Sequence, residues 1–154
     1  MSLDLFWGHV EDVRAGMLDA TNGARYVPMS HYPDRDRNCL WFITAKDTDA
    51  AKAALDGPIS ATYILSDGSK GLYADLKGKL GLSDDRAKLI ELWSPVADAW
   101  FDGGIDDPDL QLMSFHITAG EVWTTPTSGL AFMFKILRAN VTGQAPELGS
   151  HFTI

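Results

Sequence analysis

The chain has 154 residues, 45% of them hydrophobic, and 21 acidic against 13 basic residues give it a formal net charge of -8. This length and composition predict one ordered domain over residues 1–154 and argue against two domains or a disordered segment. A negative surface without a stripe of lysine or arginine would repel phosphate backbones, so we expect no nucleic-acid partner.

The sequence also favours a reducing cytoplasm over secretion or a membrane. Met1–Leu18 lacks the basic start and apolar run of a secretory signal, and no run of 18 apolar residues predicts a membrane-spanning helix. The single cysteine, Cys39, cannot form an intrachain disulfide. We therefore expect a cytoplasmic protein with no membrane contact.

The N-terminal part predicts a helix followed by a hairpin. Apolar residues from Leu3 to Met17 recur at spacings of three and four, which is typical of an amphipathic helix. Asn22-Gly23 predicts a hairpin turn, because both residues tolerate positive φ. In the extended run that follows, Ala24–Ser30, the two-residue alternation places Arg25 and Met29 on one face.

The middle of the chain predicts strands around a short helix. After a polar loop over residues 31–38, the apolar segment Cys39–Thr44 predicts a buried strand. Asp47–Leu55 is rich in alanine and predicts a helix, and Ile59–Leu65 predicts another strand. Leu72–Leu80 alternates apolar with polar residues, as a half-buried strand does.

The last third predicts two short helices, a long strand, a helix and a tail. Ser83 resembles a helix cap, and Ser94 with Pro95 predicts the start of a second helix. Trp93 and Trp100 continue the helical spacing of apolar residues across this break and are expected in the core. The remaining segments are a loop over residues 103–108, a strand over Leu110–Trp123, a helix over Leu130–Ala139 and a loose tail over about 141–154. Antiparallel strands joined by hairpins, with helices at the ends and crossovers, predict an α+β fold built on a small barrel.

Several of these segments resemble one protein family over roughly residues 5 to 150. Arg25–Met29 and Leu40–Thr44 are similar to the flavin-binding split-barrel family related to pyridoxamine phosphate oxidase. Within it, the order and spacing of Leu92–Pro95, Ala99–Phe101 and Asp106–Leu110 resemble the general stress protein 26 branch. Val141–Gly143 and Ala145–Gly149 resemble the same branch.

The resemblance implies a six-stranded antiparallel split β-barrel with flanking helices that forms a homodimer. One FMN, or FAD, would lie at each end of the dimer interface. The residues implied near the flavin ring are Arg25, Pro28, Met29, Trp41, Phe42 and Ile43. Thr44 would meet the phosphate, and Trp123 resembles a tryptophan that reaches the flavin from the partner subunit.

Two basic residues common in that branch are missing. Val27 and Ala50 stand where the branch has an arginine and a lysine on the phosphate side of the flavin, and Lys46 and Lys52 are the candidates to replace them. Thr124–Ser128 stands where true pyridoxamine phosphate oxidases have an Arg-x-His motif, so we do not expect that reaction.

Other interpretations of the same residues stay open. Judged without the family, Trp41 and Phe42 are core residues and Arg25 is a solvated hairpin charge. The aspartates of residues 102–109 and the four histidines lack metal-ligand spacing, so no metal is expected. The functions that remain are a flavin-dependent oxidoreductase of unknown substrate, a flavin-binding module without turnover, and a dimeric interaction protein without cofactor.

Overall fold

Strands β6 (Leu72–Ser83) and β7 (Leu110–Thr124) pair along their lengths at the centre of one antiparallel sheet. The structure is a computed structural model that describes residues 2–125, 129–143 and 149–154. The other strands are β1 (Ala15–Asp19), β2 (Val27–Ser30), β3 (Tyr32–Asp34), β4 (Cys39–Ala45), β5 (Ile59–Asp67) and β8 (Ser150–Thr153). The order is β2-β1-β5-β6-β7-β4-β3, and β8 pairs with β7.

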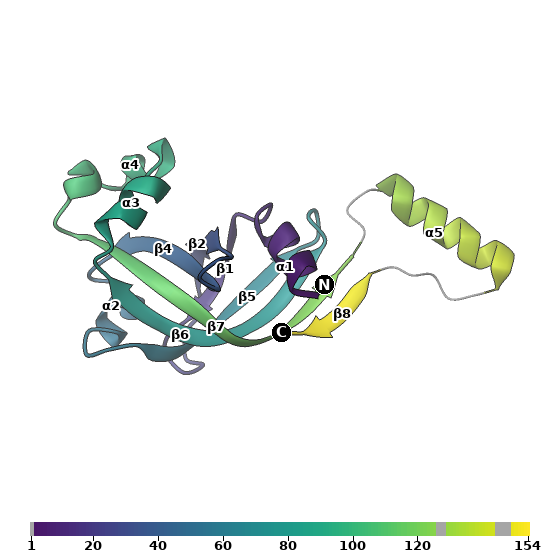
Figure 1. Cartoon of the computed structure of the whole chain (residues 1–154), viewed down its shortest axis with the longest axis horizontal. Coiled ribbons are helices and arrows are strands. Elements are labelled where there is room, and N and C mark those ends of the chain that lie inside the picture. Colours follow the sequence, from purple (N-terminus) through teal and green to yellow (C-terminus); the bar gives the residue numbers. More distant parts are fainter. Residues whose placement is uncertain (1, 126–128, 144–148) are drawn as a thin grey trace.

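The sheet curls into a half-barrel flanked by helices, which confirms the α+β split-barrel expectation (Figure 1). The helices are α1 (Ser2–Val10), α2 (Asp49–Ala53), α3 (Arg86–Leu92), α4 (Pro95–Trp100) and α5 (Gly129–Thr142), with a 3-10 turn, η1, at Gly104–Asp106. In the described part of the chain the sheet has eight strands and not six. The two additional strands, β3 and β8, are too short for their alternation to show in the sequence.

The apolar run of β4 is explained by cover on both faces of the strand. Leu40 and Phe42 are fully buried inside the curl of the sheet, with Tyr63 and Phe115. Cys39 and Trp41 face the other way and pack against Leu89 of α3. Successive side chains of a strand point to opposite faces, so a strand covered on both sides must be apolar throughout.

The N-terminal helix is shorter than its periodicity predicts. It ends at Val10, and Met17 belongs to β1. The neighbouring Gly16 lies against β5 so closely that a Cβ there would be 2.5 Å from the Ile64 carbonyl oxygen. A strand at this place therefore requires glycine, and the helical spacing of Val13 and Met17 is coincidental.

Three further boundaries differ from the sequence-based expectation. The helix expected over Leu130–Ala139 is confirmed as α5, but it continues to Thr142, and the expected loose tail contains strand β8 at Ser150–Thr153. Residues 126–128 and 144–148 of the quoted motifs lie outside the described residues. Asp85, rather than Ser83, caps α3 by accepting a hydrogen bond from the Lys88 amide. The cap of α4 by Ser94, with Pro95 at its first position, is confirmed.

Trp100 is not a core residue. It is 81% exposed at the end of α4, whereas Trp93 is half-buried. Helix α4 has only six residues, too few to bury a full stripe. This exposed tryptophan lies at the edge of the site described next.

Candidate functional site

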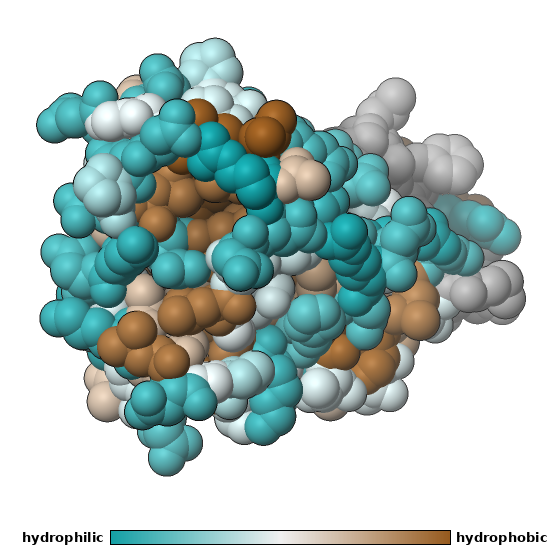
Figure 2. All heavy atoms as spheres, turned by 60° about the vertical axis from the view of Figure 1, so that its left-hand side comes forward, coloured by the Kyte–Doolittle hydropathy of each residue, from teal (hydrophilic) through white to brown (hydrophobic). Residues whose placement is uncertain are grey.

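A cavity of about 390 Å³ lies between strands β2 and β4 and helix α4. Its volume is within the range of small-molecule sites. Figure 2 brings the α3–α4 side of Figure 1 forward and shows hydrophobic atoms gathered in a hollow with hydrophilic residues around it. The residues that line the cavity are Pro28, Met29, Ser30, Tyr32, Ile43, Thr44, Ala45, Thr48, Val96, Ala97, Trp100 and Phe101.

Four of the residues that the sequence placed at the flavin meet in this cavity. Pro28 and Met29 come from β2, and Ile43 and Thr44 come from the end of β4. The residues from α4 were missed, because Trp100 was assigned to the core. The segment Ala99–Phe101 carries part of the family resemblance, and this resemblance is the sequence feature that could have placed them at the cavity.

One end of the cavity carries hydroxyl groups. The Thr44 hydroxyl is buried and lies 3.5 Å from the Thr48 hydroxyl. Thr48 donates to the Ala45 carbonyl at 2.8 Å and accepts from the Ala51 amide, so its hydroxyl is occupied as the cap of α2. Among the described residues, the Thr44 hydroxyl has this one long contact, so it is the better donor for a ligand.

Arg25 lies near this hydroxyl end, but not on the strand. The structure starts β2 at Val27, so the prediction that Arg25 and Met29 share one strand face is wrong. The turn that holds Arg25 is built by Asp19 and Thr21, with Asn22 and Gly23 at positive φ as expected. The Arg25 guanidinium lies 3.2 Å from Asp49, the first residue of α2, and both side chains are more than half exposed.

The other basic candidates do not line the cavity. Lys52 is exposed on α2, and Lys46 borders a different cavity. Ala50 is 6% exposed and part of the core, which explains why a lysine is not accommodated there. None of Arg25, Lys46 and Lys52 lines the cavity, and Arg25 is already paired with Asp49, the residue that follows Thr48.

The side chains of Trp41 and Phe42 belong to the core. Phe42 is fully buried and packs edge-to-face on Tyr63, with ring centroids 5.1 Å apart. Trp41 is 5% exposed, and its indole nitrogen donates to Asp34 at 3.0 Å. A ligand in the cavity would meet at most the backbone of these two residues.

Trp123 lies far from the cavity of its own chain. It is near the end of β7 and stacks on His151 of β8, with ring centroids 5.1 Å apart. Ile43 pairs with Leu112, eleven residues earlier on β7. At about 3.3 Å per residue this is roughly 35 Å along the strand, and Trp123 does not line the cavity of its own chain.

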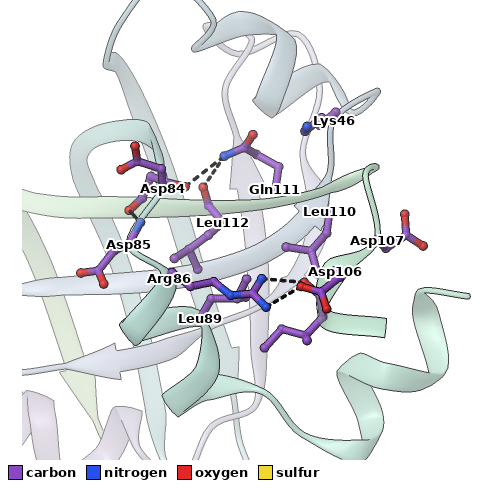
Figure 3. Close-up of a pocket in the computed structure, with 12 residues that line it drawn as sticks. Lys46, Asp84, Asp85, Arg86, Leu89, Asp106, Asp107, Leu110, Gln111 and Leu112 are labelled. Atoms are coloured by element: carbon purple, nitrogen blue, oxygen red, sulfur yellow. Dashed lines mark hydrogen bonds and ion pairs between the residues drawn. The ribbon is translucent and has the colours of Figure 1, made fainter. Parts of the chain in front are cut away.

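A second cavity, of about 340 Å³, is acidic (Figure 3). Asp84, Asp85, Asp106 and Asp107 line it. Arg86 is occupied there, donating to Asp106 at 2.5 Å and to the Ile105 carbonyl at 3.1 Å. The negative charge of this cavity disfavours an anionic ligand. Across residues 2–125, 129–143 and 149–154, no group of acidic, histidine or cysteine side chains is arranged to hold a metal ion.

Buried titratable groups near the cavity are structural. Burial raises the pKa of Cys39 to about 11, so its thiol is not a nucleophile at neutral pH. His31 is 5% exposed, with Nδ1 2.7 Å from the Tyr63 hydroxyl and Nε2 3.1 Å from the Val10 carbonyl. Tyr63 also contacts the Met29 carbonyl at 2.8 Å, so this group supports the cavity strand β2.

Stability is expected to fall as the pH drops below about 6.5. Burial lowers the pKa of His31 from its ordinary value of 6.5, an effect opposed by its hydrogen bond to Val10. The unfolded chain then binds more protons than the folded one between the two pKa values, so the free energy of unfolding decreases on acidification. Urea unfolding between pH 7.5 and 5.5 measures this. His31→Gln should reduce the change of the unfolding free energy with pH, whereas His9→Gln, at a more exposed site, should not. If the unfolding free energy changes equally with pH in the wild type and both variants, His31 is not the group responsible.

The comparisons with known proteins agree with this architecture. The profile of the family described as pyridoxamine 5'-phosphate oxidase like matches residues 2–147. The chain therefore belongs to the pyridoxamine 5'-phosphate oxidase-like family. The structures that it resembles place it in the general stress protein 26-like branch of that family.

Two solved structures illustrate the branch. A candidate general stress protein 26 from Jannaschia sp. CCS1 is 46% identical, with a TM-score of 0.92 over 99% of this chain and 97% of that one. A general stress FMN/FAD binding protein from Xanthomonas citri is 28% identical, with a TM-score of 0.70 over 82% of this chain and 90% of that one. No protein with a curated functional description matches this sequence. No helix of the described residues is long and apolar enough to cross a bilayer.

Proposed function

We propose that the cavity between β2, β4 and α4 binds a flavin, with FMN the first candidate, and that the protein is a flavin-dependent oxidoreductase of the stress-response type. The main support is the geometry of the cavity. It combines an apolar slot, formed by Met29, Ile43 and Phe101 among others, with the Thr44 hydroxyl, which has a long 3.5 Å contact to Thr48. An apolar slot suits the isoalloxazine ring, and a hydroxyl end suits a ribityl chain or phosphate.

The phosphate end fits less well than the ring end. Arg25 is paired with Asp49, and none of Arg25, Lys46 and Lys52 lines the cavity. We therefore expect most of the binding energy to come from the ring, and only a small preference for FMN over riboflavin.

The redox chemistry would belong to the flavin. Of the residues that line the cavity, Tyr32 is the only titratable one, so no acid–base pair is positioned there. The protein would bind and orient the ring and exclude water, while the cofactor transfers the electrons. The same observation favours a second candidate, a flavin-binding module without turnover.

An absorbance spectrum of the purified protein, followed by anaerobic reduction with dithionite and NAD(P)H, tests the proposal. Flavin bands with NAD(P)H turnover support the oxidoreductase. Bands without turnover with any donor support the binding module. A colourless protein that neither FMN nor riboflavin reconstitutes contradicts both and favours an interaction protein without cofactor.

We also propose that the protein acts as a homodimer in the cytoplasm. Trp123 is 38% exposed and Trp100 is 81% exposed, and a second copy is the simplest cover for such surfaces. Light scattering at micromolar concentration should give the mass of two chains. A monomeric mass would contradict the dimer but not flavin binding, which is measured separately by titration.

Charge changes at the hydroxyl end should alter FMN binding in opposite directions. Arg25→Ala is expected to weaken FMN about three- to fivefold, and Asp49→Asn, which frees Arg25, to tighten it by a similar factor. Exposed charge contacts are worth about 0.2–1 kcal/mol, which sets this size. Riboflavin lacks the phosphate and should respond to neither change. In the matched control, Lys46→Ala combined with Lys52→Ala, the affinity for both ligands should be unchanged. A strong loss of FMN affinity in that control would show that the lysines form the phosphate site.

A further inference from the structure

Helix α5 carries an uncovered apolar stripe. Met133, Leu137 and Val141 are four residues apart and therefore lie on one face of the helix. They are 55%, 58% and 87% exposed. Figure 1 shows α5 standing away from the sheet, between the ends of β7 and β8. A helix of 14 residues is marginal alone in water, so this one needs a surface to pack on.

A second exposed apolar surface lies at the other end of the molecule. Ile90 of α3 and Val96 and Trp100 of α4 are 58%, 69% and 81% exposed. Figure 1 shows α3 and α4 at the end of the sheet opposite to α5. Helix α5 therefore cannot cover this surface within its own chain, but it can do so in a second copy.

The two surfaces are also complementary in charge. Residues 95–109, which include α4, contain five aspartates and no basic residue. Arg86 of α3 pairs with Asp106, which leaves the other four aspartates to set the charge of this surface. Residues 122–143, which include α5, contain Lys135 and Arg138 and no acidic residue. In a protein with a net charge of -8, an acid-free segment is unusual, and it matches the acidic end of another copy.

We propose that α5 of each protomer packs on the α4 surface of its partner, beside the mouth of the partner's cavity, in a reciprocal exchange about a two-fold axis. Such an exchange covers both surfaces at once and closes the assembly at two chains. A 14-residue helix is about 21 Å long. Two such contacts would bury on the order of 1,000 Å², the lower limit for a specific interface. The inference deepens the proposed homodimer and does not depend on flavin binding.

Cysteine cross-linking tests this arrangement in the full-length protein. The native Cys39 is fully buried and gives no background. Val96→Cys and Leu137→Cys, combined in one chain and treated with a short bismaleimide, should give a covalent two-chain product. Each single variant should give little. Both sites are exposed, so the substitutions should leave the fold intact.

A second variant measures the contact without cross-linking. Leu137→Asp places a negative charge against the acidic surface and should raise the dimer dissociation constant about tenfold or more. Ser66→Asp, at an exposed position of β5, should leave it unchanged. The inference is overturned if the wild type is a monomer, or if it is a dimer that the double-cysteine variant does not cross-link. It is also overturned if Leu137→Cys alone cross-links as well as the double variant, because that would indicate that α5 pairs with α5. Flavin binding by a monomeric protein would leave the proposed function standing.

Discussion

Replacing Asp34 by alanine is expected to lower the free energy of unfolding by about 2–4 kcal/mol. The carboxylate accepts from the indole nitrogen of Trp41 at 3.0 Å and lies 3.2 Å from the ammonium of Lys88. The Asp34 and Lys88 side chains are 10% and 12% exposed, so the pair is nearly buried. Its removal leaves the buried indole of Trp41 without this acceptor. Among the described residues, Lys88 then keeps one acidic partner, Glu91 at 2.7 Å, so the cost exceeds that of a surface ion pair.

The effect of Asp34 should also depend on pH. Burial alone would raise the pKa of Asp34, but the hydrogen bonds from Trp41 and Lys88 outweigh it and lower the pKa below the ordinary 3.8. A lowered folded-state pKa stabilises the protein above about pH 4, and the contribution is lost as the pH falls through the folded value. Urea unfolding of wild type and Asp34→Ala should therefore converge in strong acid. Asp36→Ala, in the exposed turn that follows, is the matched control, and a comparable loss there would show that the network carries little energy.

Filling the cavity is expected to abolish flavin binding. Ile43→Trp introduces an indole into a space of about 390 Å³ that the ring would need. We expect the dissociation constants of FMN and riboflavin to rise about 100-fold or more, which corresponds to about 2.7 kcal/mol. Because the bulky side chain removes space for the ring itself, both flavins should be affected equally, unlike the result expected for Arg25→Ala.

Flavin fluorescence titrations and far-UV circular dichroism measure this prediction. Leu55→Trp adds the same side chain at a site that is 68% exposed and does not line the cavity, so it should bind flavin like the wild type. Overpacking typically costs 1–3 kcal/mol of stability, and an unchanged spectrum shows that Ile43→Trp still folds. Flavin bound with wild-type affinity by the folded variant would place the site elsewhere.

The candidate site was predicted from the sequence only in part. Met29, Ile43 and Thr44 meet as the family resemblance implied, because each lies in a segment whose motif is continuous in the chain. Trp41 carries the same resemblance and shares a face of β4 with Ile43, yet its side chain is buried against Leu89 of α3 and does not line the cavity. A motif identifies a strand, but which of its side chains meet a ligand depends on what packs against each of them.

Features that depend on neighbouring residues could be predicted without a structure. They include the alternation of β6, the apolar run of β4, the turn at Asn22-Gly23 and the cap at Ser94, which follow from side-chain period and local hydrogen bonding. The folded chain was needed to show that Arg25 pairs with Asp49, that Trp100 is exposed, and that Trp123 does not line the cavity. These outcomes depend on contacts between residues far apart in the chain, which local patterns do not encode, because a side chain is buried or exposed according to what the rest of the fold brings to it.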